Sequence, residues 1–278
     1  MMSRGWKDVS HELDCWAMRG LKARFWVRDD DACEMSTPLA RLHELATSHD
    51  ITIGLAVIPA KVHPSLVKFM ADEGRRFHPM CHGWQHINHA PAGRKPAEFG
   101  GERPISASIR DARSGFGAFR RYFAGYDAVF VPPFGQISVA MIRALPAIGF
   151  AGVSAGPGWL ERKLSYLPSL AVRIPSVRVA SRSGIPRLDV HIDPIDWQRR
   201  TAHSEDAICN AIVRSLRPRR MGLLASELPI GVVTHHLAHD DRIWGACNDA
   251  LDVLRGHRAA EFLHVGDFFG TIAHKASN

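Results

Sequence analysis

The sequence lacks any apolar run of the roughly 18 residues that a membrane-spanning helix needs. Residues 1–22 also lack the continuous apolar core of a secretory signal, and they contain His11, Glu12 and Asp14. We therefore expect no transmembrane segment and a cytoplasmic location.

Cysteines are few and irregularly spaced. The five cysteines form no C-x-x-C pair, so the pattern favours reduced thiols over a disulfide framework. Cys81 stands beside His82, but we expect it to be a small buried side chain at a strand end rather than a metal ligand.

The sequence also lacks a concentrated basic patch, although its net charge is +7 and its pI is near 9.5. The densest basic stretch, residues 214–220, is interrupted by Pro218, and no motif typical of nucleic-acid binding is present. Positive charge favours anionic partners. We expect no nucleic acid, and a phosphate-bearing small molecule suits the charge better.

Short apolar runs alternate regularly with helical segments along the chain. The pattern predicts strands at residues 23–27, 51–57, 76–80, 128–131, 150–153, 190–192 and 230–233. It predicts helices at residues 37–48, 64–73, 106–122, 139–148, 204–216, 243–255 and 267–273, and an insertion at 156–185. Repeated strand–helix units indicate a parallel sheet covered by helices, in one α/β domain spanning residues 1–278.

Polar clusters follow the ends of the predicted strands. Because (β/α) barrels assemble their sites at the carboxyl ends of their strands, this placement favours a barrel. An open doubly wound sheet binds ligands at the same edge and remains the alternative.

Three carboxylates, Asp29, Asp30 and Asp31, directly follow the strand at residues 23–27. Adjacent side chains of a strand point in opposite directions. One carboxylate can then bind a metal while a neighbour acts as a base. A solvated turn or a helix N-cap is the alternative for such a run.

Histidines dominate the next cluster. His82 and His86 are four positions apart, a spacing that brings two imidazoles together on one turn of helix, and imidazole is a common zinc ligand. Gly83 eases the turn between them. His89 could line the same site, and Asn88 could bond a substrate or fix a ligand.

A second histidine-rich segment follows the strand at residues 230–233, with His235, His236 and His239. A histidine here could bind a metal of its own or protonate a leaving group, because its pKa lies near working pH. Asp193 or Asp196 could hold that histidine by a hydrogen bond, with Trp197 packed against it.

The order of these clusters resembles that of the polysaccharide deacetylases, the NodB-homology or family 4 carbohydrate esterases. Five short motifs spread from Ala23 to Asp241 carry the resemblance. They are Asp30-Asp31, then His82 and His86, then Val131-Pro132-Pro133-Phe134-Gly135, then Asp193 to Trp197, and last Val233-Thr234-His235. The resemblance implies the distorted, incomplete (β/α) barrel of that family.

The resemblance also implies roles for individual residues. Asp30 would be the catalytic base, Asp31, His82 and His86 would hold a divalent metal such as Zn²⁺, and His235 would be the acid. Substrate-binding or supporting roles would fall to Asp29, Asn88, His89, Pro133, Phe134, Asp193, Asp196, Trp197 and His239. The implied reaction is removal of an N-acetyl group from a sugar. Phosphate- or lipid-linked sugars suit a chain without an export signal.

Departures from the family pattern leave alternatives open. Val131 stands where the family has an arginine that orients the base, and Arg28 is a candidate replacement. The third carboxylate leaves Asp29-Asp30 as a second possible pair of base and ligand.

The acid could be His236 or His239 instead of His235. Two other functions also remain open. One is a different metal-dependent hydrolase or lyase on the same barrel, and the other is a catalytically weak homologue that binds carbohydrate.

Overall fold

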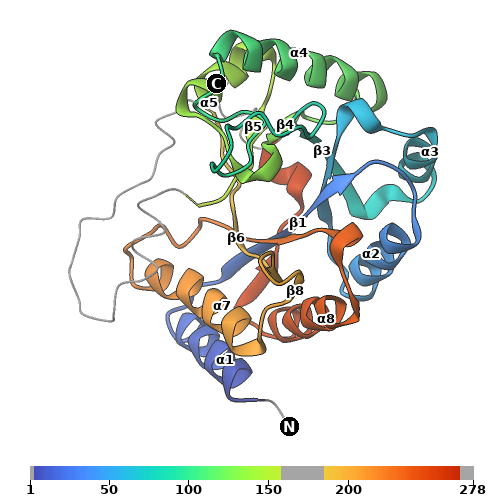
Figure 1. Cartoon of the computed structure of the whole chain (residues 1–278). Coiled ribbons are helices and arrows are strands. Elements are labelled where there is room, and N and C mark those ends of the chain that lie inside the picture. The colour runs from blue at the N-terminus through green and yellow to red at the C-terminus, as the bar shows by residue number, and fades with distance from the viewer. Residues whose placement is uncertain (1–2, 158–184, 270–278) are drawn as a thin grey trace.

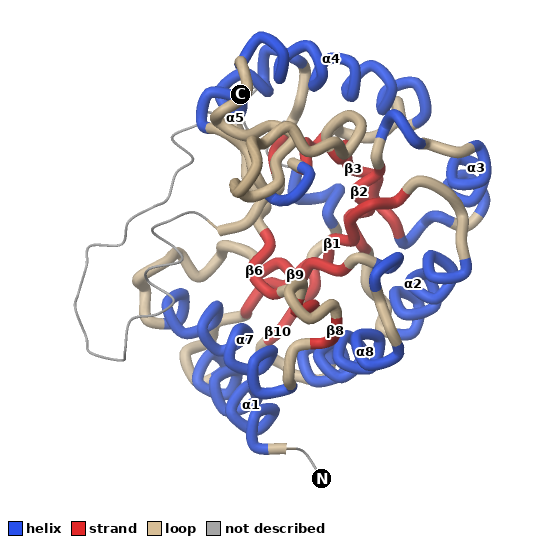
Figure 2. Tube along the Cα trace, in the orientation of Figure 1, coloured by secondary structure: helices blue, strands red, loops and turns tan. Residues whose placement is uncertain are grey.

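The structure is a computed structural model that describes residues 3–157 and 185–269 of the chain. Strands occupy the centre and helices surround them (Figures 1 and 2). The strands of the main sheet are β1 (Ala23–Ala32), β2 (Ile53–Val57), β3 (Phe77–His82), β4 (Val129–Val131), β5 (Gly152–Val153), β6 (Val190–Ile192), β9 (Ile230–Thr234) and β10 (Ala260–Phe262). The helices are α1 (Arg4–Ala17), α2 (Thr37–Ser48), α3 (Pro64–Asp72), α4 (Ile105–Tyr122), α5 (Val139–Ile148), α7 (Glu205–Arg220) and α8 (Asp241–Arg255).

The main sheet is all-parallel and curled. Its strand order is β5-β4-β3-β2-β1-β9-β6, and β10 pairs with the beginning of β1. At the open side, the backbone of Val153 bonds to Pro186 at 2.9 Å and to Leu188 at 3.1 Å, in the segment that leads into β6. The sheet therefore forms an incomplete barrel with flanking helices, which confirms the predicted α/β class and barrel type.

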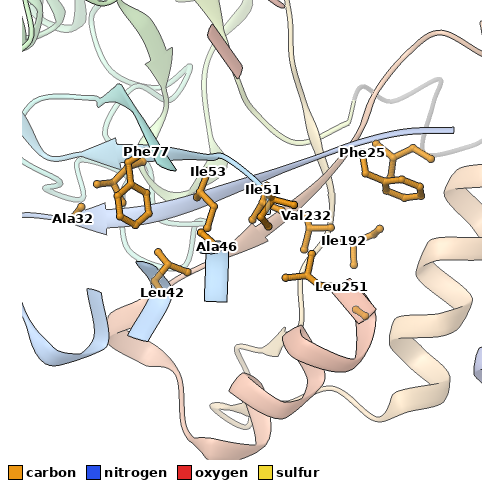
Figure 3. Packing of buried hydrophobic residues seen from close by; sticks show 14 of the residues in the cluster. Phe25, Ala32, Leu42, Ala46, Ile51, Ile53, Phe77, Ile192, Val232 and Leu251 are labelled. Atoms are coloured by element: carbon orange, nitrogen blue, oxygen red, sulfur yellow. The ribbon is translucent and has the colours of Figure 1, made fainter. Parts of the chain in front are cut away.

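The two faces of the sheet pack into separate cores. Trp26 of β1 belongs to the inner core with Met80 and Val131. Figure 3 shows the outer core, where strands pack against α2 and α8; it includes Phe25, Ala32, Leu42, Ala46, Ile51, Ile53, Phe77, Ile192, Val232 and Leu251. Because side chains alternate along a strand, residues 26, 28 and 30 share the inner face, while residues 25, 27 and 29 share the outer face.

Local signals in the sequence set several helix boundaries correctly. The Ser36 hydroxyl accepts a hydrogen bond from Leu39 N at 3.3 Å, so α2 begins at the predicted residue. Gly149 adopts φ 113°, a left-handed conformation that ends α5 at the predicted residue.

Other elements differ from the prediction. Helix α1 was not predicted, although it buries Trp6, Val9, Leu13 and Trp16 at helical spacing. Strand β10 was also missed, because three half-buried residues carry no clear periodicity. The hairpin of β7 (Ile195–Asp196) and β8 (Thr201–Ala202) lies within segments that had no assignment.

Several predicted elements have different bounds or lie partly outside the described residues. Strand β1 continues through the three carboxylates to Ala32, beyond the predicted end at residue 27. Helix α7 continues through Pro218 to Arg220, beyond the predicted end at residue 216. Most of the predicted insertion at 156–185, and the end of the predicted helix at 267–273, lie outside the described residues. Within the described ranges, none of the helices is both long and apolar enough to cross a membrane.

Candidate active site

The three carboxylates at the end of β1 point to three different places. Asp30 lies on the inner face with Arg28, and Asp29 lies on the outer face. The pairing of β1 with β2 shifts register between Asp29 and Ala32, and Asp31 has φ 75°. This irregularity turns the Asp31 side chain toward the end of β3, out of the alternation that the strand would otherwise impose.

Asp31, His82 and His86 form a compact group of possible metal ligands. Asp31 Oδ1 lies 3.1 Å from His82 Nε2 and 3.1 Å from His86 Nε2. In the part of the chain that the structure describes, this is the only group of three or more such side chains with ligand atoms all within 4.8 Å of one another. Although burial opposes ionisation, hydrogen bonds and charge from both histidines hold the pKa of Asp31 well below its usual value.

The two histidines come together without a helix. His82 is the last residue of β3, and its Nδ1 donates a hydrogen bond to the carbonyl of Val131 at 3.1 Å. That bond leaves Nε2 free to act as a ligand. His86 lies in the following loop with φ 58°, and its ring packs against Phe134 at 4.3 Å. The predicted explanation of one helical turn is therefore wrong, although the predicted convergence is correct.

The loop between the two histidines is held by Glu98, a residue to which no sequence pattern pointed. The fully buried carboxylate of Glu98 accepts hydrogen bonds from Trp84 N at 3.3 Å and Gln85 N at 2.8 Å. Gly83 has φ 60°, as the predicted turn required. A Cβ at Gly115 of α4 would lie 2.2 Å from the Gly83 carbonyl, so a glycine is needed there too.

Arg28 makes a bidentate contact with the carboxylate of Asp30 on the same strand. Its Nε and Nη2 donate to the two oxygens of Asp30 at 2.7 and 2.9 Å. Its Nη1 donates to the Ser154 hydroxyl at 2.7 Å and to the Ser154 carbonyl at 3.1 Å. Arg28 is 3% exposed. Val131, at the family's arginine position, packs in the inner core, and a buried guanidinium faces Asp30 from β1 instead.

His235 follows β9 and faces Asp30. Its Nε2 lies 3.8 Å from Asp30 Oδ2, and its ring contacts Trp197 edge-on at 4.6 Å. Its Nδ1 is buried and has no hydrogen-bond partner among the described residues.

Asp193 holds Trp197 rather than His235. Its Oδ2 accepts from the Trp197 indole at 2.8 Å, and its Oδ1 accepts from Ile195 N at 2.8 Å. Burial raises the pKa of Asp193. Asp196 accepts from the backbone of Gln198 and pairs with Arg199 at 3.2 Å. Neither carboxylate makes the expected hydrogen bond to His235, although Asp193 positions the tryptophan that packs against that ring.

His236 and His239 use their ring nitrogens on other partners. His236 pairs with Asp29 at 2.5 Å behind the inner face. Burial disfavours its charge, but Asp29 raises the pKa of His236 above the usual value. His239 Nε2 accepts a hydrogen bond from His235 N at 3.2 Å, and its ring packs against Trp244. Burial lowers the pKa of His239 to about 4.

Asn88 and His89 lie farther along the β3 loop. Asn88 Oδ1 accepts from Ala90 N at 2.9 Å and Ala97 N at 3.0 Å, which closes the loop upon itself. His89 is exposed and lines an open cleft of about 410 Å³ with Lys95 and Gln136. The structure brings neither residue into contact with Asp31, His82 or His86.

Exposed apolar side chains flank the group. Ile87 follows His86 and is 45% exposed, Phe134 is 37% exposed, Trp197 is 49% exposed, and Leu237 is 56% exposed. Phe134 and Trp197 contact His86 and His235 directly. Exposed aromatic side chains in contact with such polar groups are suited to contact a ligand.

Known proteins resemble this chain in structure but not in sequence. No family model matches the chain, and no curated protein matches it either. Solved structures do match. A family 4 carbohydrate esterase from Streptomyces lividans in complex with acetate has TM-score 0.51 and 13% identity, over 87% of this chain and 93% of that one. The T48 deacetylase with substrate has TM-score 0.50 and 14% identity, over 93% and 94%.

A family 4 pseudoenzyme from Bacillus anthracis is also similar, with TM-score 0.53 and 12% identity over 90% of this chain and 66% of that one. A mutant of such a pseudoenzyme with restored enzymatic activity has TM-score 0.52 and 13% identity. At these identities the likeness establishes the fold. The chain therefore has the incomplete barrel of the family 4 carbohydrate esterases, a fold shared by active and inactive proteins.

Proposed function

We propose that this chain is a metal-dependent hydrolase that removes an N-acetyl group from a sugar. One observation carries the proposal. The possible ligand atoms of one carboxylate and two imidazoles all lie within 4.8 Å of one another, and the neighbouring Asp30 lies 3.8 Å from His235. A catalytic zinc site typically has three protein ligands and one open position. Asp31, His82 and His86 fit that pattern in number and donor type, and we propose Zn²⁺ as the ion.

A divalent ion held there would polarise the acetamide carbonyl and make water a stronger acid. The protein itself supplies the proton transfers. Asp30 accepts the proton of the attacking water, and the bidentate contact with Arg28 keeps that carboxylate oriented. His235 protonates the departing amine. The backbone N–H of Phe134 is our proposed donor to the developing oxyanion.

Arg28 bears on the alternative that the chain is a weak homologue that only binds carbohydrate. Loss of the arginine at position 131 favours that alternative. A buried arginine that already makes two hydrogen bonds to Asp30 argues against it, because it can do the same work from a different strand.

The substrate we propose is an acetylated sugar that bears a phosphate or a lipid-linked phosphate. The net charge of +7 supports an anionic substrate. The exposed aromatic side chains of Phe134 and Trp197 suit packing against a sugar ring. Five free cysteines support a reducing, cytoplasmic location.

Metal analysis and an acetate-release screen test the proposal together. We expect about one zinc per chain, and release of acetate from at least one N-acetylated sugar. Asp30→Asn should keep the metal and lower kcat by roughly 100- to 10,000-fold, because it removes a base and no ligand. Metal lost with Asp30→Asn would make Asp30 a ligand. Sugar binding without acetate release from any substrate would favour the carbohydrate-binding homologue.

A further inference from the structure

A second aspartate–histidine pair lies directly behind the first. Asp29 is 0% exposed and His236 is 1% exposed. Asp29 Oδ1 meets His236 Nδ1 at 2.5 Å, and Asp29 Oδ2 accepts from His236 N at 2.9 Å and from the Thr234 hydroxyl at 2.7 Å. One carboxylate thus makes three hydrogen bonds to the end of β9 and the residues just after it.

The residues of the two pairs are neighbours along the chain. Asp29 and Asp30 are neighbours on β1, and His235 and His236 are neighbours after β9. The two strands are paired in register, with Asp29 opposite Thr234. Because neighbouring side chains of β1 point to opposite faces, the outer pair closes on the helix side while Asp30 and His235 face each other on the inner side.

We propose that Asp29 and His236 are positioning residues that set the separation between Asp30 and His235. This inference rests on the proposed function, in which Asp30 and His235 are base and acid. The outer pair acts through the backbone: it ties the segment that carries His235 to the strand that carries Asp30.

His235 has few anchors of its own. Its Nδ1 has no partner among the described residues, and its ring touches Trp197, which is itself half exposed. Its backbone N–H donates to His239 Nε2 at 3.2 Å and its carbonyl accepts from Ala238 N at 2.8 Å, both within the same loop. The outer pair therefore ties this loop to β1 at the residue next to His235. Catalytic groups must be held to within about half an ångström, so such a contact matters for turnover.

A purely stabilising role explains the pair poorly. A buried aspartate and histidine lose their hydration, and well-packed apolar residues at such positions are often equally stable. The adjacent outer-face positions of β1, Phe25 and Val27, are apolar. A polar pair at this one position, behind the two reacting side chains, is better explained by the geometry that it imposes.

The test compares Asp29→Leu with a matched control, Glu12→Leu. Glu12 is also a buried carboxylate held by a cation, Arg220, but it lies between α1 and α7. We expect Asp29→Leu to lower kcat by roughly 10- to 100-fold, the usual cost of losing such a supporting contact, with zinc affinity and KM little changed. The control variant should lose stability without this loss of kcat. Asp29→Asn can still accept from Thr234 and His236 N, so it should recover most of the loss.

Crystal structures of the zinc-loaded wild type and variants give a second readout that needs no activity. The Asp30 to His235 separation should lengthen in Asp29→Leu and in His236→Leu, and should stay near 3.8 Å in Asp29→Asn. An unchanged separation in both leucine variants, or equal losses of kcat in Asp29→Leu and Glu12→Leu, overturns the inference. If the wild type released no acetate, the proposed function would fail, and the structures alone would still decide whether the outer pair sets the separation. If Asp29→Leu does not fold, His236→Leu and Asp29→Asn supply the same comparison.

Discussion

The ends of β3 and β9 are both rich in histidine. The histidines at the end of β3 converge on one residue, whereas those after β9 each contact a different residue. After β3, His82 and His86 converge on one oxygen of Asp31. After β9, His235 faces Asp30, His236 binds Asp29, and His239 packs against Trp244. Three histidines within five residues therefore occupy three separate environments.

The difference arises from what each loop is tied to. The β3 loop is fixed by Glu98 and by the carbonyl of Val131, so both Nε2 atoms are turned toward one point. After β9 the chain forms a short 3₁₀ turn at His236–Ala238, so His235, His236 and His239 point in different directions and each ring has its own neighbour. A cluster of histidines in the sequence does not by itself bring their ring nitrogens together. The directions in which the side chains point decide whether the nitrogens converge.

Substitution at the β3 end should have the largest effect. His82→Ala removes one of the three proposed ligands, so we expect loss of the bound metal and of all metal-dependent turnover. Elemental analysis of the purified variant checks this. His43→Ala, on α2, is the control and should keep the metal. Full metal content in His82→Ala would move the site elsewhere, for example to the β9 end.

Substitution at the β9 end should spare the metal. His235→Ala should lower kcat by roughly 100- to 10,000-fold, the usual cost of removing a general acid, with metal content unchanged. Steady-state kinetics on the zinc-loaded protein provides the measurement. Near-normal turnover here, alongside a collapse in His239→Ala, would reassign the acid within this segment.

Glu98 offers a smaller perturbation of the β3 end. Glu98→Gln replaces one of the two acceptor oxygens with an N–H donor, which should let the loop between His82 and His86 move. We expect zinc affinity to fall by roughly 10- to 100-fold, as for other contacts that orient metal ligands. Titration against a zinc chelator measures it, with the exposed Glu102→Gln as control. Equal affinities would mean that the loop holds its shape without Glu98.

His239 should affect the free energy of unfolding rather than metal content or turnover. Burial lowers its pKa to about 4 from an unfolded value of 6.5. Between those values the unfolded chain binds more protons, so this contribution is complete above pH 6.5 and is lost as pH falls toward 4. It amounts to about 3 kcal/mol. Urea unfolding at several pH values should show a shallower acid dependence for His239→Phe than for wild type. An identical dependence would show that His239 is protonated as easily in the folded protein.

Much of the fold followed from the sequence because it depends on local pattern. Ser36 and Gly149 fixed helix ends, and apolar runs marked the buried strands. Helix α1 carries the same kind of signal in Trp6, Val9, Leu13 and Trp16, at helical spacing. Strand β10 has no such signal, because its three half-buried residues show no clear periodicity.

The sequence by itself determined which residue types stand at the ends of β1, β3 and β9, and therefore that carboxylates and imidazoles meet at one edge of a parallel sheet. Only the tertiary structure decided the direction in which each of these side chains points. A register shift and a positive φ at Asp31 separate three consecutive aspartates into an outer anchor, a carboxylate held by Arg28, and a member of the candidate metal group. Periodicity cannot encode that division, because it depends on how β1 pairs with β2 and on which neighbouring strand each carboxylate faces.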